Sequence, residues 1–186
     1  MPVLPSLDPL LVTVAAGFTA LLLLRAVFHK VTDFTAFAGT LSDYRIVPSA
    51  LVAPAAALLA AIEIVLAAGL LWNDTRPIAA VLAASLLAIY AAAMAYPLAQ
   101  GRSEISCGCG GPAEHLSPAL LWRNGVLIVV ALAAAAQITE RPTGWLDYLS
   151  IPFTVVVMWL ILETLEQALQ NHAYIAALNS RLKSGG

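Results

Sequence analysis

The chain alternates between long apolar stretches and short polar segments, and the lengths of the apolar stretches predict its fold. A helix that crosses the hydrocarbon core of a bilayer needs about 20 predominantly apolar residues. Five stretches of this kind cover residues 7–28, 47–72, 78–99, 118–138 and 148–166. The pattern predicts an all-α polytopic transmembrane helix bundle, with four core spans, a fifth span and a C-terminal helical extension.

The polar segments mark the ends of the predicted helices. Residues 73–77 form a short polar hairpin, and Pro77 suits the first turn of the helix that follows. Residues 163–186 keep helical spacing but become polar, so the fifth helix either extends out of the bilayer or bends and lies on its surface. We expect this tail to be a solvated helix end, the alternative being a surface for a partner. Residues 1–186 are then a single integral membrane domain.

Composition agrees with a membrane protein. Hydrophobic residues make up 61% of the 186 residues and charged residues 11%, whereas soluble domains have about 25% charged residues. The net charge is -2 and the nine Lys and Arg form no basic stripe, so we expect no nucleic-acid partner. Long alanine runs favour close packing between the helices.

Positive charges are distributed unevenly between the two ends of the predicted bundle. Seven of the nine fall at the end that holds the 29–46 and 100–117 loops and the C-terminus: Arg25, Lys30, Arg45, Arg102, Arg123, Arg181 and Lys183. Only Arg76 and Arg141 fall at the other end. By the positive-inside rule, the end with seven cations would face the cytoplasm.

The two cysteines lie two residues apart, in the loop between the third and fourth predicted spans. Cys107 and Cys109 would close a very small ring if oxidised, and strained disulfides are the labile ones. Neighbouring arginines would favour the thiolate form. We expect a redox-active dithiol, with no metal and no bound cofactor. A metal site that includes His115 is one alternative, although the spacing differs from that of common zinc sites. A pair of inert loop cysteines is the other.

Glu63 is the one acidic residue deep inside a predicted span. It lies nine residues before Trp72, or roughly 13 Å from that end of the helix. An ionisable group at this depth is costly, which makes it a candidate for function. Either Glu63 is structural, being neutral or paired with Arg25 or Arg123, or it takes part in proton or quinone chemistry.

The predicted topology brings a group of polar residues near one membrane surface. The group is Arg25, His29, Lys30, Tyr44, Arg45, Cys107, Cys109 and Arg123. Each cation alone is expected to anchor the chain at the interface. Together they would form a site that holds a thiolate or an anionic partner.

The same residues carry a resemblance to a known family. In order they are Arg25 with His29-Lys30, the segment Asp43-Tyr44-Arg45-Ile46-Val47-Pro48, Glu63, the loop Cys107-Gly108-Cys109-Gly110-Gly111-Pro112, and Arg123-Asn124. Over roughly residues 7–138 the chain resembles the methylamine-utilisation protein MauE family, within the DoxX-like redox-associated membrane proteins. Many relatives in the wider group carry an aromatic residue where this chain has Gly110.

The resemblance implies a membrane accessory protein for the maturation of methylamine dehydrogenase. It would act in processing, transport or disulfide formation of the small (β) subunit, together with a thioredoxin-like maturation protein, in the cell's inner (cytoplasmic) membrane. Cys107 and Cys109 would be the redox dithiol of a thiol–disulfide oxidoreductase component, with Glu63, Arg25 and Arg123 in support. The alternative is a non-catalytic scaffold or chaperone that presents the subunit to this partner.

The resemblance and the charge count disagree about the side of the membrane that bears the cysteine loop. The small subunit is expected in the periplasm, which favours a loop on the outer side. The charge count favours the cytoplasmic side. Electron transfer across the membrane, with the loop at one end of the path, would reconcile the two. Alternatively, the charge rule fails for this chain, and we expect the loop on the periplasmic side, where the chemistry of the inferred partner takes place.

Overall fold

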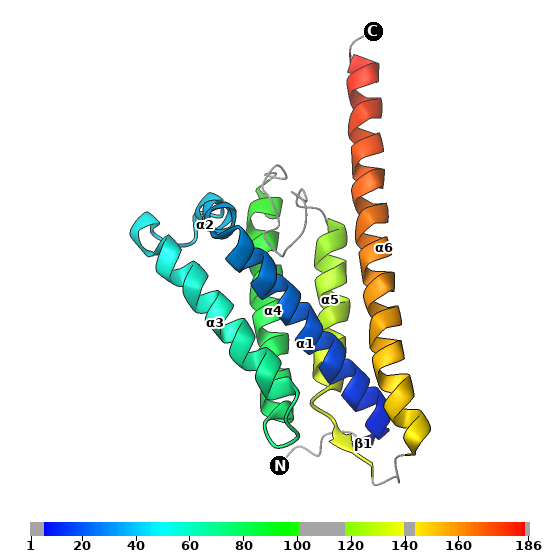
Figure 1. Cartoon of the computed structure of the whole chain (residues 1–186). Coiled ribbons are helices and arrows are strands. Elements are labelled where there is room, and N and C mark those ends of the chain that lie inside the picture. Colours follow the sequence, from blue (N-terminus) through cyan, green and yellow to red (C-terminus); the bar gives the residue numbers. More distant parts are fainter. Residues whose placement is uncertain (1–5, 101–117, 140–143, 185–186) are drawn as a thin grey trace.

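The protein is a helix bundle with one very short sheet (Figure 1), seen in a computed structural model that describes residues 6–100, 118–139 and 144–184. The elements are β1 (Ser6–Leu7), α1 (Pro9–Thr32), α2 (Phe34–Asp43), the 3-10 helix η1 (Ser49–Leu51), α3 (Val52–Leu70), α4 (Arg76–Ala99), α5 (Pro118–Ala133), β2 (Gln137–Ile138) and α6 (Trp145–Ser184). The predicted all-α polytopic bundle is confirmed.

Four helical segments are long and apolar enough to cross a membrane. They are Pro9–Thr32, Ser49–Leu70, Arg76–Ala99 and Trp145–Leu169, and Pro118–Ala133 is a shorter apolar helix. Successive long helices run in opposite directions, so that the ends of α1 and α4 and the start of α5 lie at one end of the bundle (Figure 1). We call this the loop end, because residues 100–117 connect α4 to α5 there.

Much of the predicted 29–46 loop is helical. α1 continues to Thr32, and α2 follows it after Asp33. The Asp33 carboxylate accepts a hydrogen bond from the Ala36 N–H at 3.1 Å, which is the contact of a helix N-cap. This cap starts a second helix where the polar composition alone predicted a loop.

The helix in the fourth predicted span ends at Ala133, five residues before residue 138. Three buried alanines form a turn after it, and β2 then pairs in parallel with β1, Ser6 opposite Gln137. The Thr139 N–H also donates to the Leu7 carbonyl at 3.0 Å. Pairing with β1 provides backbone partners that further helical turns would otherwise supply.

α6 is one continuous helix from Trp145 to Ser184, although the sequence divided it into a span over 148–166 and a tail over 163–186. At 1.5 Å per residue its 40 residues measure about 60 Å, roughly twice the thickness of a bilayer core. It extends beyond the rest of the bundle at the loop end (Figure 1). The helix has no break between Trp145 and Ser184, and its extension out of the bilayer stays a prediction.

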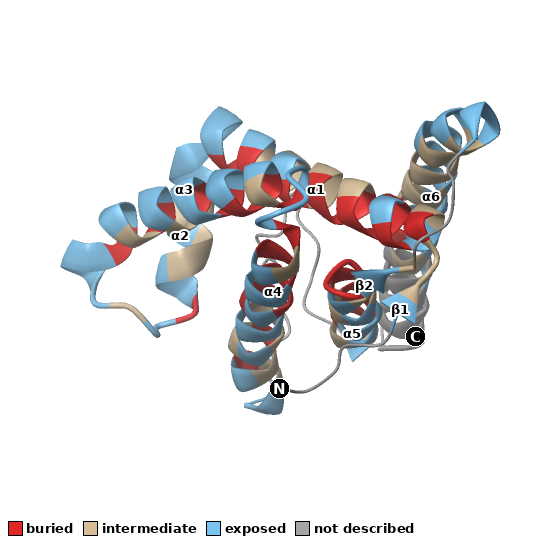
Figure 2. Ribbon diagram, turned by 90° about the horizontal axis from the view of Figure 1, so that it is seen from below, coloured by how far each residue is buried: buried red, intermediate tan, exposed pale blue. Residues whose placement is uncertain are grey.

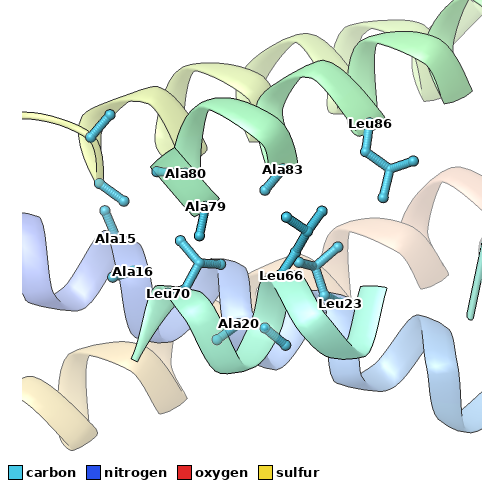
Figure 3. Close-up of a cluster of buried hydrophobic side chains, with 13 residues drawn as sticks. Ala15, Ala16, Ala20, Leu23, Leu66, Leu70, Ala79, Ala80, Ala83 and Leu86 are labelled. Carbon is cyan, nitrogen blue, oxygen red and sulfur yellow. The ribbon is translucent and has the colours of Figure 1, made fainter. Parts of the chain in front are cut away.

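Small side chains form the centre of the bundle, as the alanine runs predicted. Figure 3 shows Ala15, Ala16 and Ala20 of α1, Leu66 and Leu70 of α3, and Ala79, Ala80 and Ala83 of α4 in one buried cluster. Buried residues follow the inner faces of α1 and α4, whereas α6 is mostly exposed or half-buried (Figure 2). Small residues let the helix backbones approach closely, which is how membrane helices commonly associate.

Candidate functional site

The predicted cysteine site lies in a part of the chain that the structure does not describe. Both cysteines, Cys107 and Cys109, fall outside the described residues. His115, the further ligand of the alternative metal site, falls outside them as well. The described ends of their loop are the last turn of α4 and the start of α5. Two groups of charged residues lie inside the bundle towards this loop end, and they form the candidate site.

The first group is an ion pair between Lys30 of α1 and Glu63 of α3. The Lys30 Nζ lies 2.6 Å from Glu63 Oε1 and 2.8 Å from Oε2. The two side chains are 2% and 0% exposed. The pair is therefore buried in the bundle, and each charge is compensated by the other.

Helix geometry explains how Lys30 reaches Glu63. Cα–Cβ bonds tilt towards the N-terminus of a helix. Lys30 lies near the C-terminal end of α1, so its side chain leans back into the bundle. α3 packs against α1 and runs in the opposite direction (Figure 1), so Glu63 leans towards the loop end. The two side chains consequently converge from different depths.

Aromatic rings surround the Lys30–Glu63 pair. The Tyr90 hydroxyl donates a hydrogen bond to Glu63 Oε1 at 2.7 Å. The Lys30 Nζ lies 5.0 Å from the ring centre of Phe37 and 5.3 Å from that of Tyr90, within the range of cation–π attraction. Lys30 and both rings also line an apolar cavity of about 200 Å³ among α1, α2, α3 and α4.

The second group, which we call the α6 ion cluster, consists of Arg25, Arg123, Glu163 and Glu166. Glu166 pairs with both arginines, with Oε1 2.7 Å from Arg123 Nη1 and Oε2 3.1 Å from Arg25 Nη1. Arg25 Nη2 also lies 3.1 Å from Glu163 Oε1, and its guanidinium lies 5.3 Å from the centre of the Trp159 ring. The cluster joins α1, α5 and α6 and contains two charges of each sign.

One predicted pairing of these residues is wrong. Glu63 does not pair with Arg25 or Arg123, because carboxylates of α6 bind both arginines. Within the predicted tail, Glu166 is 6% exposed, whereas Thr164, Leu165, Gln167 and Ala168 are exposed, so the solvated helix end stays a prediction.

The other described members of the predicted surface group belong to neither ion group, although Tyr44 lines the same cavity as Lys30. Tyr44 is buried against Met94 and Leu120. Arg45 is exposed and has a positive φ of 55°, as expected of a chain reversal after α2. His29 is half-buried. The fold thus divides the predicted single site into separate environments.

Burial of cations also changes the charge count. Arg25, Lys30 and Arg123 are paired inside the bundle, and Arg76 at the other end is 7% exposed. The positive-inside rule concerns charges in loops and at helix ends. Without Arg25, Lys30, Arg76 and Arg123, the sequence has four cations at the loop end and one at the other, so the direction of the charge bias is unchanged.

Sequence reasoning missed Tyr90, Glu163 and Glu166 as members of these groups. Residues three apart share a face of a helix, so Glu163 and Glu166 present two carboxylates on one side of the last predicted span. Arg25 and Arg123 are two cations inside spans near the same end. Matching the two pairs by charge and depth would have predicted the α6 ion cluster.

Comparison with known proteins relates the chain to one family. The model of the family described as methylamine utilisation protein MauE matches residues 8–137. The methylamine utilization protein MauE of Paracoccus denitrificans is 34% identical over 150 residues, which cover 75% of this chain and 81% of that protein. The protein of the same name from Methylorubrum extorquens is 32% identical over 180 residues, covering 96% and 91%. No solved structure matches the chain.

Proposed function

This chain belongs to the MauE family of methylamine utilisation proteins, and we propose that it is a membrane accessory protein for the maturation of methylamine dehydrogenase. Membership gives it a role in methylamine utilisation, and its apolar helices make it a membrane protein. The proposed target is the small (β) subunit, in processing, transport or disulfide formation. The observation that carries the proposal is the family match over residues 8–137, which includes the cysteine loop.

The proposed chemistry is thiol–disulfide exchange between the Cys107–Cys109 pair and a thioredoxin-like maturation protein. A thiolate of the reduced partner attacks one sulfur of the oxidised pair, which breaks the S–S bond and forms a mixed disulfide. The partner's second thiol then resolves this bond. The partner leaves as a disulfide, and Cys107 and Cys109 are left as two thiols, so that two electrons and two protons have moved. The oxidised partner is then able to oxidise the subunit.

The described contacts favour a positioning role for the supporting residues. Among the described residues, carboxylates of α6 bind Arg25 and Arg123, so that the α6 ion cluster holds equal numbers of positive and negative charges. Arg123 lies five residues into α5, or about 8 Å along the helix from its start at the cysteine loop. The cluster therefore supports the loop by holding α1, α5 and α6 together, and Glu63 joins α1 to α3 through Lys30.

Replacement of both cysteines tests the proposed chemistry. We expect a Cys107→Ser, Cys109→Ser variant to leave the small subunit incompletely oxidised in a strain that lacks the native chain. The matched control is Ser106→Ala in the same loop, which should support full maturation. The measurements are methylamine dehydrogenase activity and the number of free thiols in the subunit. Full maturation with the double variant would contradict the proposal.

We place the protein in the inner (cytoplasmic) membrane, with the cysteine loop on the periplasmic side where the small subunit is expected. A membrane-impermeant maleimide added to intact, mildly reduced cells should then label Cys107 and Cys109. The control is the same labelling after the cells are permeabilised. Labelling only after permeabilisation would place the loop on the cytoplasmic side, as the charge count predicts.

A non-catalytic scaffold is the second candidate function, and the length of α6 favours it. The helix extends beyond the bundle at the loop end (Figure 1), where a partner would meet it. Truncation after Gln170 keeps the α6 ion cluster and removes the outer part of the helix. A scaffold would lose co-purification of the subunit in this variant and keep it in the double cysteine variant. A thiol–disulfide factor would instead support maturation of the subunit in the truncated variant and fail to support it in the double cysteine variant.

A further inference from the structure

The apolar cavity beside the Lys30–Glu63 pair has the features of a binding site. Its volume is about 200 Å³, and side chains of α1, α2, α3, α4 and the segment after α2 form its walls. Leu41, Val47 and Leu59 make most of the wall apolar, and Lys30 lies at one end. Pockets for whole drug-sized molecules have volumes of about 300–1,000 Å³. This cavity therefore suits a single substituted ring, with the rest of the ligand outside.

The polar end of the cavity favours a neutral hydrogen-bond acceptor. A lysine ammonium has three N–H donors, and Glu63 accepts two hydrogen bonds from Lys30. The third donor has no acceptor among the described residues. Because Glu63 already compensates the positive charge, a second anion would leave the buried site with excess negative charge. A carbonyl oxygen fits this position better than a carboxylate or a phosphate.

The walls and the mouth indicate a flat, lipid-soluble ligand. Phe37, Tyr44 and Tyr90 line the cavity and offer ring faces and edges for aromatic packing. Ile89 also lines it and is 61% exposed on α4, one of the helices able to cross a membrane. Ile46, which is 52% exposed, lies at the same cavity. A ligand would thus reach the site from the lipid side of the bundle.

We propose that this cavity binds the head ring of a lipid-soluble quinone. One ring carbonyl accepts a hydrogen bond from Lys30, the ring packs among Phe37, Tyr44 and Tyr90, and the apolar tail passes Ile89 into the lipid. The proposal concerns binding and does not depend on the cysteine dithiol. Its test measures ligand occupancy and not subunit maturation, so each of the two proposals can fail without the other.

Photolabelling of the full chain in lipid nanodiscs tests the site. The probe is an azidoquinone with a decyl tail. The competitors are decylubiquinone and decylbenzene, which share the tail but differ in the ring, because only the quinone ring carries carbonyl and methoxy oxygens. We expect labelled peptides from α2 and α4, and displacement by decylubiquinone at concentrations at least about tenfold lower than by decylbenzene, the effect of a hydrogen bond from a charged donor. Equal displacement by both would define a hydrocarbon groove and overturn the proposal, as would labelling confined to other helices.

Two substitutions on the same helix supply the matched control. Ala93 lines the cavity, and a phenyl group there would fill it, whereas Ala92 is exposed and does not line it. We expect Ala93→Phe to reduce labelling about tenfold or more and Ala92→Phe to change it less than twofold. Unchanged labelling in Ala93→Phe would contradict the proposed site. If that variant does not fold, the competition experiment on the unchanged protein decides the question alone.

Discussion

Lys30 and Glu63 lie 33 residues apart in the sequence, and their side chains form a two-pronged ion pair inside the bundle, with N···O distances of 2.6 and 2.8 Å. Each residue alone would be a buried, uncompensated charge among apolar helices, which is costly in a membrane. The pair is therefore best tested by changing one residue at a time and then both together.

We expect Lys30→Met alone to destabilise the protein strongly, because it leaves the Glu63 carboxylate buried without its ammonium partner. Removal of one member of a buried pair typically costs about 3–5 kcal/mol of unfolding free energy. The double variant Lys30→Met, Glu63→Gln removes both charges and should recover most of that loss. The measurement is a melting temperature in detergent micelles for all four members of the cycle. Additive losses in the double variant would show that the two side chains do not depend on each other.

Glu166 should contribute more to stability than Glu163. Glu166 is 6% exposed and binds two arginines, whereas the Glu163 side chain is 31% exposed and binds one. We expect Glu166→Gln to lower the unfolding free energy by about 2–4 kcal/mol and Glu163→Gln by less than about 1 kcal/mol. Thermal unfolding of the two variants in the same detergent compares them directly. Equal losses would contradict the bridging role of Glu166.

α3 and α4 approach each other closely at Gly69, in the last turn of α3. A Cβ atom there would lie 3.0 Å from the Ala79 Cβ on α4, which is closer than carbon atoms normally approach. The Ala79 Cβ is attached directly to the backbone of α4, so it can move away only if the helix moves with it. We expect Gly69→Ala to destabilise the protein by about 1–3 kcal/mol through overpacking.

Gly39 in α2 provides the matched control for this substitution. A Cβ at Gly39 has nothing within 4 Å, and alanine favours a helix over glycine by about 1 kcal/mol. Gly39→Ala should therefore leave the melting temperature unchanged or raise it. A Gly69→Ala variant as stable as Gly39→Ala would show that the two helices separate at little cost.

The main helices and their packing could be predicted from the sequence because both depend on local composition. Apolar stretches of about 20 residues predict where α1, α3, α4, α5 and α6 lie, and alanines such as Ala80 and Ala83 predict close contacts. The end of α5 could not be predicted in this way. It depends on pairing between Ser6 and Gln137, which only the folded chain brings together.

The Lys30–Glu63 pair could not be predicted, because counting residues from a helix end measures depth along one helix only. Glu63 lies in the interior of α3, whereas Lys30 lies two residues before the end of α1. Counting along each helix therefore places the two residues at different depths in the membrane. α2 separates the two helices along the chain, and the long lysine side chain covers the remaining distance. Side-chain direction and helix offset, which the hydrophobic pattern does not contain, decide this contact.

Two truncations within α6 should separate the structural part of this helix from the part available to partners. Truncation after Leu162 removes Glu163 and Glu166 and leaves Arg25 and Arg123 in the bundle without these carboxylates. Uncompensated buried charges destabilise a fold, so this variant should accumulate poorly in membranes and unfold at a lower temperature. Truncation after Gln170 keeps both glutamates and should melt close to the full chain. Equal stability of the two truncated proteins would contradict this division, since the α6 ion cluster would then contribute little to holding α1, α5 and α6 together.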